Sequence, residues 1–67
     1  MINSQRLEGR ISESGLKKAY VARMAGLTLQ GFLNKINGKS EFRVSEVQAI
    51  KTVLSLSQEE VHEIFLI

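Results

Sequence analysis

Apolar residues recur at helical spacing in five short runs along this 67-residue chain, and no segment alternates with the period of a strand. The runs predict helices at about 4–14, 17–25, 29–36 and 44–54, with a fifth that begins after Ser57. Each helix is near or below the roughly 12–15 residues that an isolated helix needs in water. Their apolar faces must therefore close on one another, which predicts an all-α domain of five short helices.

Residues that favour helix ends bound these runs. Thr28 and Ser57 are good N-caps, and Glu60 completes a capping box with Ser57. Gly26 suits the left-handed end of the second helix, and the pair Asn37-Gly38 indicates a turn after the third. The apolar positions expected to face the core are Leu7, Ile11, Val21, Met24, Ala25, Leu27, Phe32, Ile36, Val44, Val47, Ile50, Val53, Leu54, Val61, Ile64 and Phe65.

The most informative segment is 17–38, KKAYVARMAGLTLQGFLNKING. Two short amphipathic helices joined by a tight turn that contains Gly26 are the signature of the helix-turn-helix. That motif places its second helix in the major groove of DNA. The small side chain of Ala22 fits a close crossing between the two helices.

Length and composition predict one domain, 1–67, of ordinary globular character. The chain has no cysteine and one histidine, so neither a disulfide nor a metal site is expected, and no cofactor is expected either. No apolar run approaches a membrane span, and the N-terminus lacks the apolar stretch of a signal peptide. We expect a cytoplasmic protein that does not enter a membrane. The residues show no pairing of a nucleophile with a base, so an enzyme is not expected.

Charge is distributed unevenly although the net charge is only +2. Residues 1–43 carry eight Lys or Arg against three Glu, whereas residues 44–67 carry one Lys against four Glu. The basic part includes the helix-turn-helix, which makes a polyanion a plausible partner. The alternative is that both parts are simply solvated.

The chain resembles the Cro/C-repressor (XRE-type, lambda-repressor-like) helix-turn-helix family, and most closely a small phage-encoded branch. The stretches that carry the resemblance are LEGRI at 7–11, Ala22, Gly26, GFLNKINGK at 31–39, EF at 41–42, SEVQAI at 45–50 and LSLSQEEVHEIF at 54–65. The resemblance implies a compact five-helix lambda-repressor-like domain. It also implies a Cro-like transcriptional regulator that binds double-stranded operator DNA in a phage lysis/lysogeny switch, in the cytoplasm of a bacterial host.

The resemblance further implies which residues meet the DNA. Those expected to contact a DNA base or a partner are Leu29, Gln30, Gly31, Leu33 and Asn34, and those expected at phosphates are Lys18, Thr28, Lys35, Lys39, Ser40 and Arg43. Gln30 and Asn34 carry amides, which can bond adenine in a bidentate manner, and Leu29 can touch a thymine methyl. Phosphate contacts position a protein without reading sequence. The alternative is that these are ordinary exposed residues.

The third helix departs from the family's pattern because leucines and a glycine stand on or near its outer surface. Leu29 and Leu33 cannot hydrogen-bond a base edge, and exposed apolar side chains suit a protein interface. A second hypothesis follows, in which the chain is an antirepressor that binds a companion phage repressor through this helix and masks it from DNA. A third is a non-specific DNA binder with both leucines partly buried. The apolar end, Phe65 to Ile67, either extends the core or forms a homodimer contact.

Overall fold

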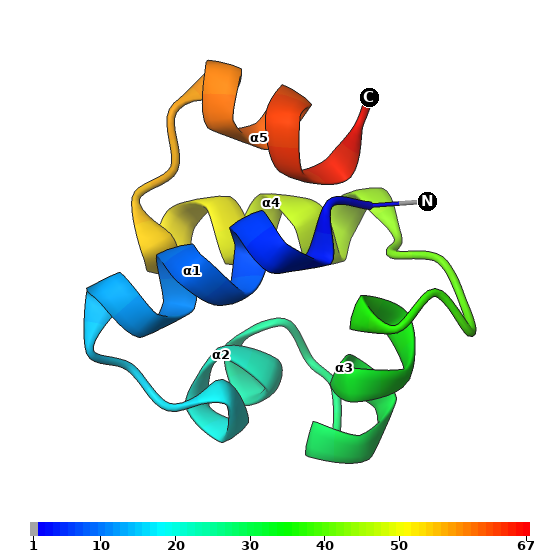
Figure 1. Cartoon of the computed structure of the whole chain (residues 1–67). Coiled ribbons are helices and arrows are strands. Elements are labelled where there is room, and N and C mark those ends of the chain that lie inside the picture. The colour runs from blue at the N-terminus through cyan, green and yellow to red at the C-terminus, as the bar shows by residue number, and fades with distance from the viewer. Residues whose placement is uncertain (1) are drawn as a thin grey trace.

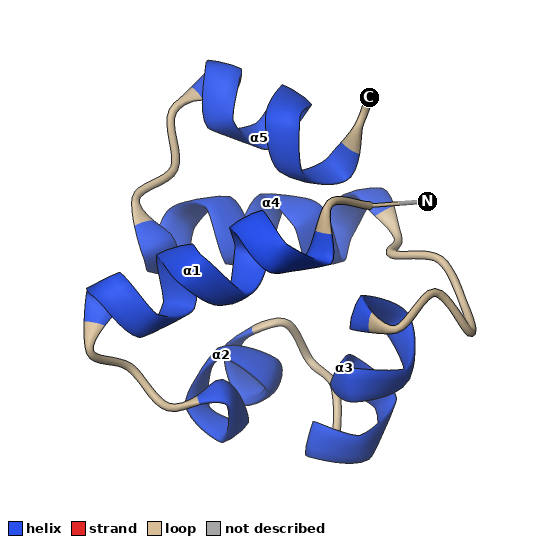
Figure 2. Cartoon of the chain, viewed as in Figure 1, coloured by secondary structure: helices blue, strands red, loops and turns tan. Residues whose placement is uncertain are grey.

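The computed structural model of the chain describes residues 2–67, which form five α-helices and no strand. The helices are α1 (Ser4–Ser14), α2 (Lys18–Met24), α3 (Leu29–Ile36), α4 (Val44–Leu54) and α5 (Gln58–Phe65) (Figures 1 and 2). The expected five-helix all-α domain is confirmed. The bounds agree with the sequence pattern except at α2, whose two outermost expected residues act as caps rather than helical residues.

The helices are arranged with α1 and α4 side by side across the middle of the molecule (Figure 1). Helices α2 and α3 form one end, and α5 packs on α1 and α4 at the opposite end. The termini lie on the α5 side of the molecule. The end formed by α2 and α3 is therefore free of other elements on its outer side.

Side-chain caps explain where three of the helices begin. The Asn3 side chain accepts a hydrogen bond from the Arg6 N–H at 3.2 Å. The Ser57 hydroxyl accepts from the Glu60 N–H at 3.1 Å, and the Glu60 carboxylate accepts from the Ser57 N–H at 2.9 Å. This reciprocal pair satisfies two helix-end donors and is the capping box expected from the sequence. Thr28 caps α3, as described below.

One contiguous core joins all five helices. Its buried members are Leu7, Ile11, Val21, Ala22, Phe32, Ile36, Val47, Ile50, Leu54, Leu56, Val61, Ile64 and Phe65. The three phenylalanines make edge-to-face contacts, with Phe32 and Phe42 ring centres 6.0 Å apart and those of Phe42 and Phe65 5.4 Å apart. Such aromatic pairs stabilise the fold by more than the burial of their apolar surface alone. They join α3, the segment after it, and α5.

Two positions expected in the core are exposed. Met24 is 47% exposed and Val44 is 78% exposed, so both predictions are wrong. Met24 is the last residue of α2 and Val44 the first of α4. Helical periodicity assigns a residue to a face of its helix. It does not say whether another helix packs against that face at the end of the helix, where Met24 and Val44 lie. At the C-terminal end, Phe65 is in the core, whereas Leu66 and Ile67 are exposed.

Candidate nucleic-acid interface

Helices α2 and α3 are joined by a tight turn that contains Gly26. Gly26 has a φ of +77°, in the left-handed region that glycine adopts without penalty. The Leu27 N–H donates to the Ala22 carbonyl at 2.9 Å, which closes the end of α2. Nothing lies within 4 Å of where a Cβ on Gly26 would be, so glycine is favoured here by backbone conformation rather than by space.

Buried side chains on the inner faces hold the two helices together. Val21 and Ala22 are buried on α2, and Phe32 and Ile36 are buried on α3. Helix α3 begins where the Thr28 hydroxyl accepts a hydrogen bond from the Gly31 N–H at 3.0 Å. The direction of α3 is thus set by a cap at its start and by two apolar anchors one turn apart.

Helix α3 carries the five residues predicted to meet a base edge or a partner. Leu29 and Gln30 are exposed, with Leu29 at 43%, and the remaining members are half-buried. The Gln30 amide nitrogen donates to the Asn34 amide oxygen at 3.0 Å, one helical turn along. The two amides predicted as base readers therefore act as one hydrogen-bonded unit rather than as two independent groups.

Three of the residues predicted to contact phosphates are exposed in the segment between α3 and α4. These are Lys39, Ser40 and Arg43. Thr28 is also exposed, although its hydroxyl already serves as the α3 cap. Lys18 is half-exposed and forms an ion pair with Glu8 of α1. A phosphate contact by Lys18 therefore has to compete with that carboxylate.

The ammonium group of Lys35 is not placed to contact a phosphate. Its ammonium is 2.7 Å from a carboxylate oxygen of Glu46 on α4, and the two side chains are only 13% and 9% exposed. The same Glu46 oxygen accepts a hydrogen bond from the Arg43 N–H at 2.8 Å. Lys35 therefore joins the end of α3 to the start of α4 and does not extend toward the surface that Lys39 and Arg43 present. Its predicted phosphate role is withdrawn on this geometry.

Glu46 is buried and remains ionised because of these partners. Burial alone raises the pKa of its carboxyl group, but the Arg43 N–H and the Lys35 ammonium together hold that pKa below its ordinary value of 4.5. A carboxylate in the first turn of a helix also interacts favourably with the helix dipole. Arg43 is the N-cap residue of α4, but its side chain has no acceptor and cannot cap the helix. The Glu46 carboxylate instead accepts a hydrogen bond from the Arg43 N–H at this end of α4.

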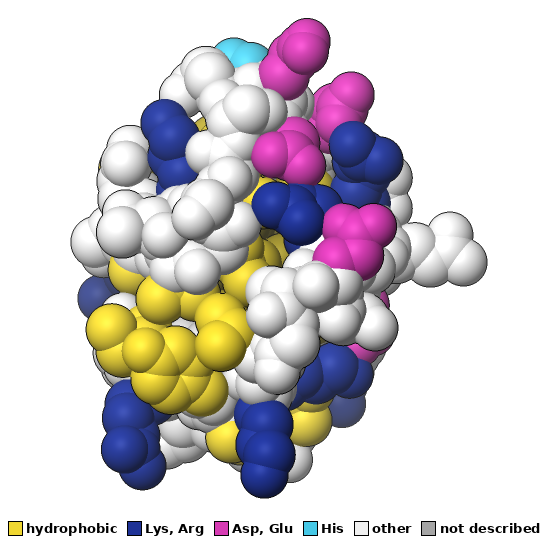
Figure 3. Space-filling view, turned by 90° about the vertical axis from the view of Figure 1, so that its left-hand side faces the viewer, with side chains coloured by type: hydrophobic (Ala, Val, Ile, Leu, Met, Phe, Trp, Pro, Cys, Tyr) yellow, Lys and Arg dark blue, Asp and Glu magenta, His cyan; other side chains and the backbone are white. Residues whose placement is uncertain are grey.

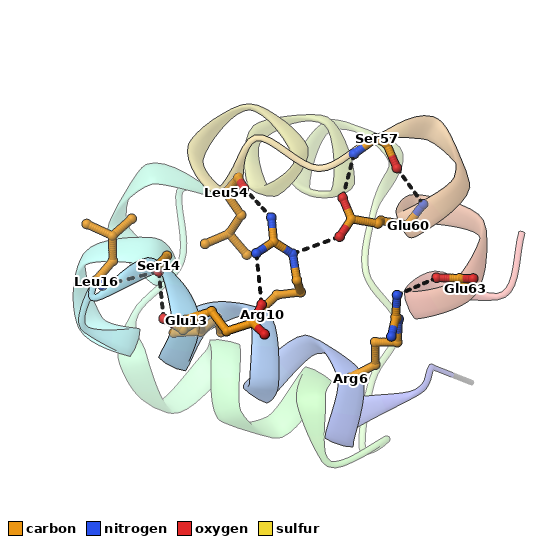
Figure 4. Close-up of polar contacts among 10 residues, drawn as sticks. Arg6, Arg10, Glu13, Ser14, Leu16, Leu54, Ser57, Glu60 and Glu63 are labelled. Carbon is orange, nitrogen blue, oxygen red and sulfur yellow. Dashed lines mark hydrogen bonds and ion pairs between the residues drawn. The ribbon is translucent and has the colours of Figure 1, made fainter.

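A second set of ion pairs joins α1 to α5, on the side away from α3 (Figure 4). The Arg10 guanidinium lies 2.9 Å from Glu60 and 3.1 Å from Glu13, and it donates to the Leu54 carbonyl at 3.0 Å. Arg6 lies 2.7 Å from Glu63. The hydrogen bond from the Ser57 N–H, together with the nearby Arg10, lowers the pKa of Glu60. Arg10 is thus bound within the fold, with its side chain 23% exposed, whereas Arg6 is half-exposed and a polyanion would have to compete with Glu63 for it.

The remaining basic side chains have no acidic partner in the part of the chain that the structure describes. They are Lys17, Arg23, Lys39, Arg43 and Lys51. In the space-filling view, which faces the side of the molecule where α2 lies, basic side chains mark the lower edge, whereas most visible acidic side chains lie in the upper half (Figure 3). Lys17 and Arg23 were not among the predicted contacts, although their exposed positions at either end of α2 were readable from the sequence.

Within residues 2–67 there is no group of three or more acidic or histidine side chains placed to hold a metal ion, and no helix is long and apolar enough to cross a membrane. Searches for similar proteins returned no matching family model, no matching curated protein and no matching solved structure. The function of the chain is therefore inferred from its own residues.

Proposed function

We propose that this protein is a small helix-turn-helix transcriptional regulator that binds double-stranded operator DNA through α3. One observation carries the proposal. The end of the molecule formed by α2 and α3 presents the Gln30–Asn34 amide pair, and the segment that follows α3 carries Lys39 and Arg43, which have no acidic partner among the described residues. Amide side chains on a helix of this motif are suited to base edges in the major groove. The unpaired cations are suited to the flanking phosphates.

In this pose the Thr28 end of α3 enters the major groove. Lys39 and Arg43, in the segment after α3, meet the DNA backbone and fix the register without reading sequence. Occupancy of an operator by such a domain excludes other proteins from the same DNA. This is the role of a Cro-like regulator in a phage lysis/lysogeny switch, which we propose on the family resemblance of the sequence.

The salt dependence of DNA binding tests this proposal. The double variant Lys39→Gln/Arg43→Gln and the wild type are titrated against labelled duplex DNA by fluorescence anisotropy at several salt concentrations. The logarithm of the affinity is expected to fall with the logarithm of salt by about 0.9 per neutralised phosphate, so the double variant is expected to reduce this slope by about 2.

Lys51→Gln is the matched control. It also removes a positive charge without an acidic partner, but the Lys51 ammonium donates a hydrogen bond at 3.0 Å to the side-chain oxygen of Gln58 in α5, and α5 lies at the opposite end of the molecule from α2 and α3. Its salt slope is expected to equal that of the wild type. A wild-type protein that shows no salt-dependent binding to duplex DNA, phage operator regions included, contradicts the proposed function.

A second candidate function is supported by the apolar surface of α3. Leu29 is 43% exposed and Leu33 is half-buried beside it, with no charged side chain of α3 outside the Lys35 pair. Exposed apolar groups with few charges are typical of the centre of a protein interface. On this alternative, α3 binds a companion phage repressor and masks its DNA-binding surface.

Co-purification with the companion repressor distinguishes the two functions. The antirepressor function requires a complex that forms without DNA and is lost in Leu29→Asp, whereas Lys39→Gln leaves it intact. A complex that survives Leu29→Asp removes the basis of this alternative.

A further inference from the structure

A shallow groove with a basic rim is formed by α2 and the segment that leads into it. The groove has a volume of about 410 Å³, and the side chains that line it, here called the basic face, are Leu16, Lys17, Ala19, Tyr20 and Arg23. Tyr20 is the largest of them and is 46% exposed. Lys17 and Arg23 have no acidic partner among residues 2–67. An exposed aromatic ring beside unpaired cations suits a partner that is both apolar and acidic.

Helix α5 carries an exposed stripe of the opposite charge. Glu59, Glu63 and Leu66 follow one another at a spacing of four and three positions, on the side of α5 away from its buried residues, and are here called the acidic face. Leu66 is 58% exposed. Residues 58–67 contain three Glu and no Lys or Arg, whereas residues 15–24 contain three Lys or Arg and no acidic residue. The chain thus carries, on its own surface, the apolar and acidic chemistry that the basic face suits.

The two faces cannot meet within one copy, because α2 and α5 lie at opposite ends of the molecule (Figure 1). Between two copies the charges decide the arrangement. A symmetric contact through α5 would bring the acidic residues of both copies together, and one through α2 would bring the cations together. Like charges that face each other disfavour both arrangements. Opposite charges meet only when α2 of one copy lies on α5 of the next.

We propose that copies of this chain associate head to tail, with the basic face of one copy on the acidic face of the next. Tyr20 packs against Leu66, and the cations of the rim face the two glutamates. Such a contact is heterologous, so each added copy leaves one face of each kind free and the assembly extends beyond a dimer. Neither face includes a residue of α3, and the inference is therefore independent of the proposed DNA-binding function.

Sedimentation velocity of the full chain, without DNA and at increasing protein concentration, tests this inference. At low salt the average mass of the wild type is expected to rise with concentration beyond that of a dimer. Added salt is expected to shorten the assemblies, because it screens exposed charges. Lys17→Glu/Arg23→Glu reverses the charge of the rim and is expected to weaken the association by roughly 10-fold or more.

Two blocked variants identify the faces. Tyr20→Asp blocks the basic face and Leu66→Asp the acidic face, and both residues are exposed enough for the fold to survive, which thermal unfolding checks. Each variant alone is expected to remain a monomer. An equimolar mixture is expected to form a dimer that grows no further, because each variant supplies the face that the other lacks. Leu29→Asp, the same change at a 43% exposed residue of α3, is the matched control and is expected to associate as the wild type does.

Three results would overturn the inference. The first is a wild type that remains monomeric at millimolar concentration and low salt. The second is a wild type that stops at a dimer and is dissociated by Leu66→Asp but not by Tyr20→Asp, since this indicates a symmetric contact through α5. The third is a mixture of the two blocked variants that remains monomeric. All three are measured without DNA, so they leave the DNA-binding function to its own salt titration.

Discussion

Replacing Lys35 by methionine tests the ion pair that joins α3 to α4. Methionine keeps most of the aliphatic volume of lysine but leaves the nearly buried Glu46 carboxylate without its partner at 2.7 Å. A hydrogen bond to a charged group contributes about 1.5–3 kcal/mol, and the surviving hydrogen bond from the Arg43 N–H, at 2.8 Å, limits the loss. We expect the free energy of unfolding at pH 7 to fall by about 2 kcal/mol, which corresponds to a melting temperature lower by roughly 10 °C in a domain of this size.

A double-mutant cycle measures the pairwise part of this effect. Urea and thermal unfolding, followed by circular dichroism, are compared for Lys35→Met, Glu46→Gln and the double variant. The double variant is expected to be more stable than the sum of the single losses predicts, by about 1 kcal/mol, because it leaves no unpaired charge near the core. Lys51→Met, which removes a cation without an ion pair, is expected to change stability by no more than about 0.5 kcal/mol. Additive losses in the cycle would refute the pairing.

The pH dependence of stability follows from the lowered pKa of Glu46. Its pKa in the folded protein lies below the ordinary value of 4.5, so the unfolded chain binds this proton more readily. The stabilisation is complete above pH 4.5 and is lost as the pH falls through the lower pKa of the folded state. Glu46→Gln is therefore expected to have a flatter stability profile below pH 4.5 than the wild type, measured by urea unfolding.

DNA binding separates this structural role of Lys35 from a phosphate contact. At a temperature where both proteins are folded, Lys35→Met is expected to keep the salt slope of the wild type. A slope reduced by about 0.9, the value for one phosphate, would contradict the position that the structure gives Lys35.

Three further changes test the fold. Gly26→Ala is expected to lower the free energy of unfolding by about 1 kcal/mol, because Gly26 has a positive φ. Gly9→Ala, inside α1 with open space around it, is expected to raise the free energy of unfolding by up to about 1 kcal/mol. Equal effects of the two substitutions in urea unfolding would contradict this expectation. Ser57→Ala removes the α5 cap and is expected to cost about 1 kcal/mol, with Ser57→Thr nearly neutral by the same measurement. Phe32→Ala empties a fully buried site and is expected to cost about 3–5 kcal/mol, so a cooperative thermal transition near that of the wild type would refute its place in the core.

Local signals in the sequence were sufficient for the helices themselves. A cap or a glycine makes its contacts within a few residues along the chain, so Thr28, Gly26 and the Ser57–Glu60 box could be read directly. The apolar periodicity likewise identified the buried faces of α3 and α5. The exposure of Gln30 follows from the same pattern, because residues opposite a buried stripe face solvent. Leu29 lies on the side of that stripe, three positions before Phe32, so its exposure at the start of α3 does not follow from the pattern.

The sequence by itself thus determined the five helices, their inner faces and the outward position of Gln30 on α3, because these depend on neighbours within one or two helical turns. Only the tertiary structure decided which charges are free. Lys35 and Glu46 are separated by 11 positions, and Arg10 meets the Leu54 carbonyl 44 positions away. Contacts between charged groups at such separations depend on how the helices pack in space, so a local sequence pattern cannot predict them. That packing assigns Lys35 to the scaffold and leaves the Gln30–Asn34 pair on the surface.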